Sequence, residues 1–80
     1  MREKFIEYFN EHIVKEDRYV NHDYNLKKAK ISIGFRESDD LDSEVKRCYR
    51  LVIQALTEQR LSIDYLVPEM VRVFKNGKEI

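Results

Sequence analysis

The sequence predicts a small α+β domain that is mainly helical. Helical hydrophobic spacing flanks a segment in which apolar and polar residues alternate, and the last quarter fits either a kinked helix or a β-hairpin. The expected order is therefore helix, strand, helix and then that ambiguous segment. Eighty residues with 42% hydrophobic content, two Gly and one Pro predict one compact domain over residues 1–80.

Residues 1–15 have the spacing of an amphipathic helix. One side is apolar, with members at i, i+4, i+7 and i+8: Phe5, Phe9, His12 and Ile13. The opposite side carries an acidic ladder: Glu3, Glu7 and Glu11. Such a ladder is typical of a solvated face, so only the apolar side is expected to pack.

A loop and a strand are predicted next. Residues 16–25 contain turn formers and no clean period. The following segment, KKAKISIGF at residues 27–35, alternates strictly between apolar and polar positions, as a half-buried strand does. The side chains expected to face the core are Ala29, Ile31, Ile33 and Phe35, and those expected to face away are Lys28, Lys30, Ser32 and Gly34.

Residues 41–60 are predicted to form the central helix. Its apolar residues cover an arc of roughly 200° on a helical wheel: Leu41, Val45, Cys48, Tyr49, Leu51, Val52, Ile53, Ala55 and Leu56. One packing surface covers roughly 100° or slightly more, so this helix is expected to be buried on two sides. Cations lie at the centre of the remaining arc: Lys46, Arg47 and Arg50.

Carboxylates cluster where this helix begins: Glu37, Asp39, Asp40, Asp42 and Glu44. Ser38, Asp39 or Asp40 is placed to cap the helix, and acids in the first turn interact favourably with the helix dipole, by roughly 0.3 to 1 kcal/mol each. A calcium loop would need a glycine hinge and spaced ligands, which this stretch lacks. The acids are therefore interpreted as a helix start, and no metal is predicted.

Residues 61–80 fit two different structures. A helical spacing runs through Ile63, Leu66, Val67, Met70, Val71 and Phe74. With Ser62 as a candidate N-cap, this spacing favours a helix. Against the helix, Pro68 would cost roughly 3 kcal/mol in a helix interior, and KNGK at residues 75–78 is a good hairpin turn. A β-hairpin is the alternative.

Charge and cysteine content exclude several classes of function. Fifteen basic and fifteen acidic residues give a pI near 6.7, so no global field attracts nucleic acid or an anionic membrane. The single cysteine, Cys48, fits a reducing, cytoplasmic compartment. The opening MREKFIEYF carries acids, and no apolar run exceeds three residues, so neither a signal peptide nor a membrane span is predicted.

No residue pattern predicts catalysis. His12 lies on the apolar side of the first helix, His22 lies in the loop, and neither has a metal-binding spacing to Cys48. Cys48 falls inside the apolar arc of the central helix, where thiols are inert. Phosphate loops and nucleophile elbows need more than the two glycines present. We therefore expect no enzyme and no cofactor.

A basic surface is the strongest candidate binding site. It combines cations of the strand with cations of the central helix: Lys28, Lys30, Lys46, Arg47 and Arg50. If the two elements pack side by side, these residues merge into a surface for phosphates or for an acidic partner. The alternative is an ordinary solvated face whose charges are neutralised by Glu3, Glu7, Glu11 or Glu58.

These observations predict a non-enzymatic module that binds and modulates a larger protein, because segregated charge on a compact scaffold favours specific association. An inhibitor encoded by a mobile element would fit. The alternative function is nucleic-acid binding through the basic face. A helix-turn-helix is the less suitable form of it, since residues 61–74 would expose Asp64 and Glu69 beside Arg72, a poor set for reading bases.

A homodimer is also expected. If residues 61–80 form a hairpin that extends the sheet, part of the wide apolar arc should stay exposed, namely Leu51, Ile53 or Tyr49. Pairing of central helices across a two-fold axis would bury them.

Overall fold

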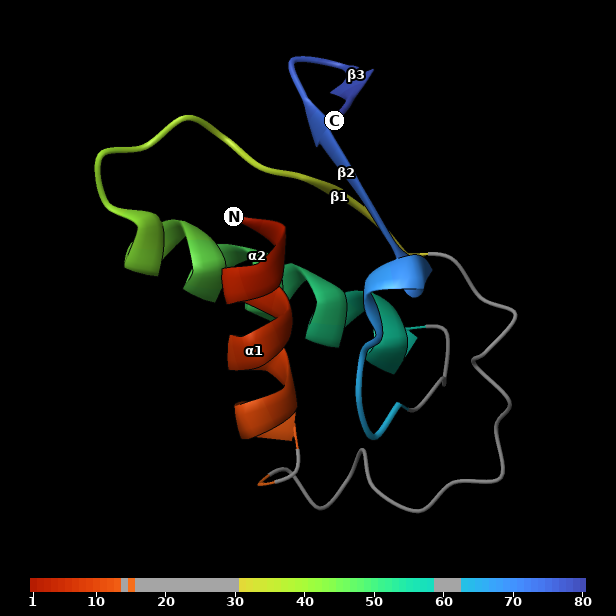
Figure 1. Ribbon diagram of the computed structural model, residues 1–80. Helices are drawn as coiled ribbons and strands as arrows, with labels where there is room; N and C mark the ends of the chain where they lie inside the picture. The colour runs from red at the N-terminus through yellow and green to blue at the C-terminus, as the bar shows by residue number, and fades with distance from the viewer. Residues whose placement is uncertain (14, 16–30, 59–62) are drawn as a thin grey trace.

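The computed structural model of the chain describes residues 1–13, 15, 31–58 and 63–80. Figure 1 shows its elements in order: α1 (Arg2–Ile13), β1 (Ile31–Gly34), α2 (Leu41–Glu58), the 3₁₀ turn η3 (Pro68–Met70), β2 (Val71–Lys75) and β3 (Lys78–Glu79). The predicted small α+β class is confirmed. The loop predicted at residues 16–25, the start of the predicted strand and the end of the predicted central helix lie outside the described residues.

The strands form one mixed sheet in the order β1-β2-β3. β1 pairs with β2 in parallel, from Ile31 opposite Val71 to Gly34 opposite Phe74. β3 returns antiparallel to β2, with Lys75 opposite Lys78. Because β1 and β2 are parallel, the chain must cross over between them, and α2 belongs to that crossover (Figure 1).

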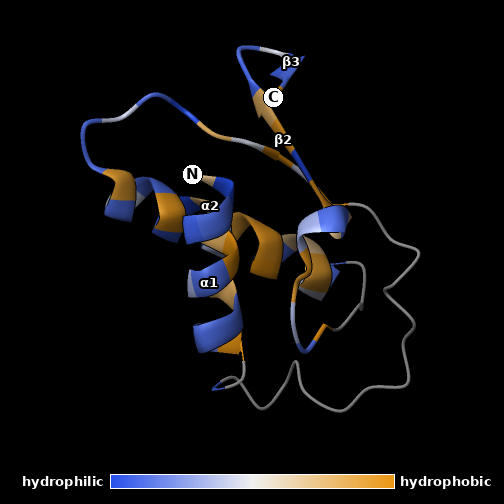
Figure 2. Ribbon diagram, in the orientation of Figure 1, coloured by the Kyte–Doolittle hydropathy of each residue, from blue (hydrophilic) through white to orange (hydrophobic). Residues whose placement is uncertain are grey.

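The core lies between the two helices and one face of the sheet. α1 buries the side that its spacing predicts: Phe5, Ile6, Phe9 and Ile13. Figure 2 shows the hydrophobic residues of α1 along one side of the helix. From the sheet, Ile33, Val71 and Val73 enter the same cluster, while Ser32 and Gly34 are exposed. The alternation predicted for β1 is therefore confirmed over its described part.

The buried arc of α2 is narrower than the sequence predicts. Leu41, Leu51 and Ala55 are exposed. Tyr49 and Ile53, by contrast, are each only 8% exposed. α1 covers Tyr49: the centroids of the Phe9 and Tyr49 rings lie 5.6 Å apart, in an edge-to-face arrangement. Of the three residues expected as candidates for exposure, Leu51 is exposed, at 50%, and the assignment of Tyr49 and Ile53 to an exposed interface is wrong because both are buried.

The C-terminal segment is the hairpin and not the favoured helix. Pro68 opens the short 3₁₀ turn, a position where its missing N–H costs no hydrogen bond, and β2 begins directly after that turn. Asn76 and Gly77 have φ values of 52° and 78°, the left-handed pair that a two-residue hairpin turn requires. Because residues 63–80 contain no α-helix, the helix-turn-helix alternative is also wrong.

Asn10 joins α1 to the extended segment before η3. Its amide Nδ2 donates to the carbonyl oxygen of Leu66 at 3.1 Å, and its Oδ1 accepts the Leu66 N–H at 2.7 Å. The side chain thus satisfies both backbone groups of a residue that is itself buried. This contact positions the chain that leads into β2.

Candidate functional site

The acidic stretch before α2 is the helix start that the sequence predicts. Asp40 caps the helix: its Oδ1 accepts the Ser43 N–H at 3.1 Å, and its Oδ2 accepts the Ser43 hydroxyl at 2.7 Å. The hydroxyl hydrogen bond is the main cause that lowers the pKa of Asp40. Among the described residues, no group of three or more His, Cys, Asp or Glu side chains is arranged to hold a metal ion.

Glu44 is a buried carboxylate that ties α2 to the end of β1. It is 6% exposed and accepts the backbone N–H of Arg36 at 2.8 Å. Arg47 donates to it from Nε at 3.1 Å and also from Nη2. The same Nη2 donates to the carbonyl oxygen of Gly34 at 2.9 Å. The Glu44 and Arg47 side chains therefore hold successive parts of the chain around β1.

Sequence reasoning placed Glu44 only in the first helical turn and missed this role. The available signal is the i, i+3 spacing between Glu44 and Arg47, which brings opposite charges together on a helix. The hydrogen bond from Arg47, helped by the Arg36 N–H, holds the pKa of Glu44 at about 2 although burial opposes this. Glu44 is thus ionised at neutral pH.

Arg47 differs from the free binding cation that the sequence predicts. It is paired with Glu44 and bonded to Gly34, and its hydrogen bond with Glu44 raises its pKa. A ligand phosphate or carboxylate would have to replace a buried, charge-assisted contact to use this guanidinium. Arg47 is therefore a structural residue at the edge of the predicted basic surface.

Cys48 and His12 occupy packed positions. Burial raises the pKa of the Cys48 thiol to about 11, with Arg47 opposing and Glu44 adding to the shift. The thiol is therefore protonated at neutral pH, and its nucleophilic form is rare. His12 stacks on the Tyr8 ring at 3.8 Å between centroids, and its Nδ1–H donates to the Tyr8 carbonyl at 2.8 Å. His22 lies outside the described residues.

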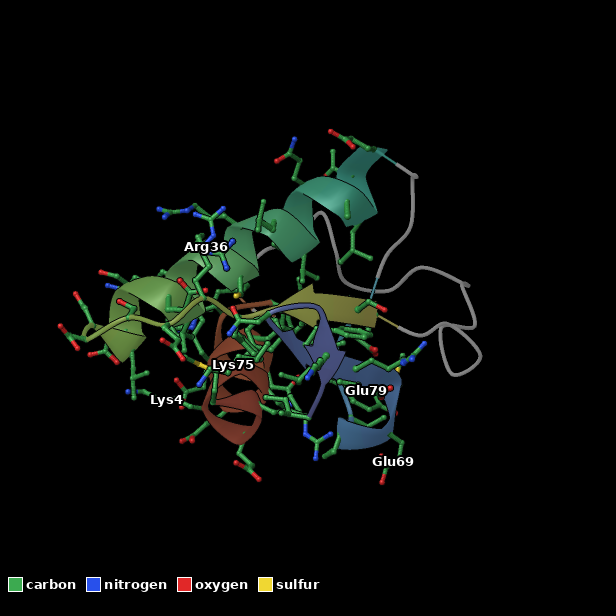
Figure 3. All side chains as sticks on the ribbon, turned by 90° about the horizontal axis from the view of Figure 1, so that it is seen from above. Lys4, Arg36, Glu69, Lys75 and Glu79 are labelled. Carbon is green, nitrogen blue, oxygen red and sulfur yellow. The ribbon has the colours of Figure 1, made fainter. Side chains whose placement is uncertain are left out.

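Lys46 and Arg50 remain exposed, one turn apart on the outer side of α2. Arg36 is exposed too, and Figure 3 shows it beside α2, away from Glu69 and Glu79. Leu51, next to Arg50, presents an apolar surface within this group. We call Arg36, Lys46, Arg50 and Leu51 the cationic face. Lys28 and Lys30, which the sequence predicts to join it, lie outside the described residues.

The cations of this face form no ion pair with a described acidic residue, although Asp40 lies close enough to Lys46 for their charges to interact. Ion pairs join four of the other described cations to acids: Lys4 to Asp42, Arg47 to Glu44, Arg72 to Glu79 and Lys75 to Glu37. Arg2, Lys15 and Lys78 are likewise exposed without an ion pair to a described acid. Glu58, considered as a neutralising acid, accepts a hydrogen bond from Gln54 at 3.0 Å and forms no ion pair with a described cation. Among the described residues, no ion pair has to be broken for a ligand to reach Arg36, Lys46 or Arg50.

A pocket of about 470 Å³, which Arg36 of the cationic face also lines, lies where the segment 35–39, the start of α2 and the hairpin end meet. Phe35, Leu41 and Ile80 give it apolar walls. Its charged lining is balanced between Arg36 and Lys75 on one hand and Glu37 and Asp39 on the other. Because Lys75 and Glu37 already pair at 2.8 Å, the pocket has no clear preference for a cation or an anion.

No protein family model, no curated protein and no solved structure matches this chain. Within the described helices, none is both long and apolar enough to cross a lipid bilayer.

Proposed function

We propose that this chain is a non-enzymatic module that binds a larger protein through the cationic face and modulates it by covering part of its surface. The observation that carries the proposal is a set of exposed cations that form no ion pair with a described acid, Arg36, Lys46 and Arg50, together with the half-exposed Leu51 on the same helix as Lys46 and Arg50. Apolar side chains ringed by charge are the usual composition of a protein interface. An acidic partner gains charge complementarity without breaking an ion pair among the described residues.

The state of the candidate catalytic groups supports a non-enzymatic role. Cys48 is buried with a pKa of about 11, so it is a poor nucleophile. His12 donates its Nδ1–H to the backbone carbonyl of Tyr8, and its ring stacks on the Tyr8 ring. Neither Cys48 nor His12 lines the pocket described above.

Nucleic-acid binding through the same face is the weaker alternative. Phosphate binding draws on many unpaired cations, and Arg47 is already held by Glu44. Stacking of single-stranded bases also needs aromatic rings among the cations, and the cationic face has none.

The test compares charge reversals at matched positions. Lys46→Glu with Arg50→Glu removes cations of the face, whereas Lys15→Glu with Lys78→Glu makes the same change in net charge at exposed sites elsewhere. A partner captured from native host extract is purified, and its affinity for each variant is measured by isothermal titration calorimetry. We expect the first variant to lose at least about tenfold in affinity and the second to bind like the wild type.

Equal affinity of the two variants would overturn the proposal. Binding to a mixed DNA or RNA pool that falls steeply with salt, and is lost only in the Lys46→Glu, Arg50→Glu variant, would favour the nucleic-acid alternative instead.

A further inference from the structure

β1 exposes backbone groups along the edge that faces away from β2. In a parallel pair, the N–H and C=O of one residue point to the same side, and successive residues alternate. Phe35 donates its N–H to the Phe74 carbonyl at 3.1 Å, so Phe35 and Ile33 face β2. The backbone groups of Ser32 and Gly34 consequently point outward.

Only one of these outward groups has a partner in the described part of the chain. The Gly34 carbonyl accepts the hydrogen bond from Arg47 at 2.9 Å. The Gly34 N–H and both backbone groups of Ser32 have no hydrogen bond to another described residue, and both residues are exposed. An unpaired edge of this kind is a template for an added strand.

α2 carries an apolar side chain on the side through which it bonds to this edge. Glu44 accepts the Arg36 N–H, and Arg47, three residues further along α2, donates to the carbonyl of Gly34, two residues earlier in the chain than Arg36. α2 and β1 therefore run in opposite directions. Figure 1 shows this opposite course of the two elements. Four helical residues rise about 6 Å and two strand residues about 6.6 Å, so Leu51, one turn beyond Arg47, lies on the side of α2 that faces toward the Ser32 end of β1.

We propose that the partner contributes an extended segment that pairs with the outer edge of β1 as an additional strand. Its residues alternate between apolar side chains, which cover Leu51, and acidic side chains, which meet Arg36 and Arg50. The acidic character follows from the cations around this edge, whereas a second copy of this chain would bring further cations to it. The inference rests on the proposed function and specifies the form of the partner.

The probe is a displayed peptide library in which Val, Ile, Leu or Phe alternates with Asp or Glu. A matched library carries Lys or Arg in place of the acids. We expect the acidic library to be enriched on the wild-type protein and the basic library not to be. Failure of the acidic library to enrich over the basic one would overturn the proposal.

The decisive variant is Ser32→Pro. It removes the outward N–H of Ser32 and leaves the β1–β2 hydrogen bonds, which use Ile33 and Phe35, in place. Ser32→Ala, the matched control, keeps the N–H. By fluorescence anisotropy, a selected peptide should bind Ser32→Pro at least about tenfold more weakly and Ser32→Ala within about twofold of wild type.

Peptides N-methylated at alternate amides answer the same question if Ser32→Pro fails to fold. Methylation in one register should abolish binding and in the other register should not. Wild-type binding by folded Ser32→Pro, or tolerance of both methylated registers, would overturn strand pairing. If Lys46→Glu with Arg50→Glu still weakens binding in that case, the proposal of binding through the cationic face stands and only the proposal of strand pairing is refuted. A dimer of the wild type that Ser32→Pro dissociates would assign the edge to a second copy.

Discussion

Glu44 stabilises the fold because several donors converge on one buried carboxylate. The Arg36 N–H fixes the chain after β1, and Arg47 links the same carboxylate to the Gly34 carbonyl. Hydrogen bonds to a charged group stabilise more than neutral ones do, and removing one partner leaves the others without a partner in a buried place. The sequence predicts that Glu44 interacts with the helix dipole, whereas in the structure its carboxylate connects α2 to the chain that follows β1.

We predict that Glu44→Gln lowers the free energy of unfolding by about 2 kcal/mol at pH 7. The pKa of Glu44 is about 2 in the folded protein against an ordinary value of 4.5. Its ionised form therefore stabilises the fold above pH 4.5, and that contribution disappears as the pH falls through 2. Urea unfolding of both proteins at several pH values should show their difference shrinking across this range.

Glu69→Gln is the matched control, because Glu69 is an exposed carboxylate. It should change the unfolding free energy little at any pH. A Glu44→Gln effect that stays constant between pH 7 and pH 2 would show that the contribution comes from shape and not from charge.

At the scale of the elements, two local features decide where the C-terminal segment goes. The left-handed Asn76 and Gly77 turn the chain back on itself, so β2 and β3 pair. Asn10 holds the segment before η3 against α1 through the Leu66 backbone. The turn is local in sequence, whereas the Asn10 contact joins residues 56 positions apart.

We predict that Asn10→Ala lowers the free energy of unfolding by about 2 kcal/mol, because the Leu66 N–H and C=O lose their partner near the core. Glu7→Ala, an exposed change on the same helix, should be close to neutral. Urea denaturation measures both. An unchanged midpoint for Asn10→Ala would mean that water replaces the amide without loss.

At the scale of the whole molecule, surface ion pairs link segments that are distant in sequence. Lys4 on α1 meets Asp42 on α2 at 2.7 Å, and Lys75 on β2 meets Glu37 at 2.8 Å. Each such exposed pair contributes at most about 1 kcal/mol. Their main consequence is the distribution of charge, since Arg36, Lys46 and Arg50 form no such ion pair with a described acid.

The burial of Tyr49 and Ile53 within the chain removes the reason for the central helices to pair through them. The apolar residues that α2 still exposes, Leu41, Leu51 and Ala55, offer too little apolar surface for a stable two-fold interface. We therefore predict a monomer by sedimentation equilibrium over a hundredfold range of concentration, unchanged by Leu51→Lys. A dimer that Leu51→Lys dissociates would restore the interface that the sequence suggests.

The sequence by itself determined the elements that depend on local periodicity and capping. The spacing of Phe5, Phe9 and Ile13 placed the buried side of α1, strict alternation placed the inward side of β1, and the acids before Leu41 marked the start of α2. Each of these patterns acts over a few neighbouring residues, so no knowledge of the rest of the chain is needed to interpret it.

Only the tertiary structure decided the features that depend on contacts between distant residues. Helical spacing favoured a helix over residues 61–80, but Pro68, the turn at Asn76 and pairing with β1 select a strand there. Packing against α1 buries Tyr49, and Glu44 and Arg47 form hydrogen bonds with the backbone at the end of β1. A helical wheel cannot show these outcomes, because it describes one helix without the elements that pack against it. It therefore cannot distinguish a side chain that bonds to another element from one that faces solvent.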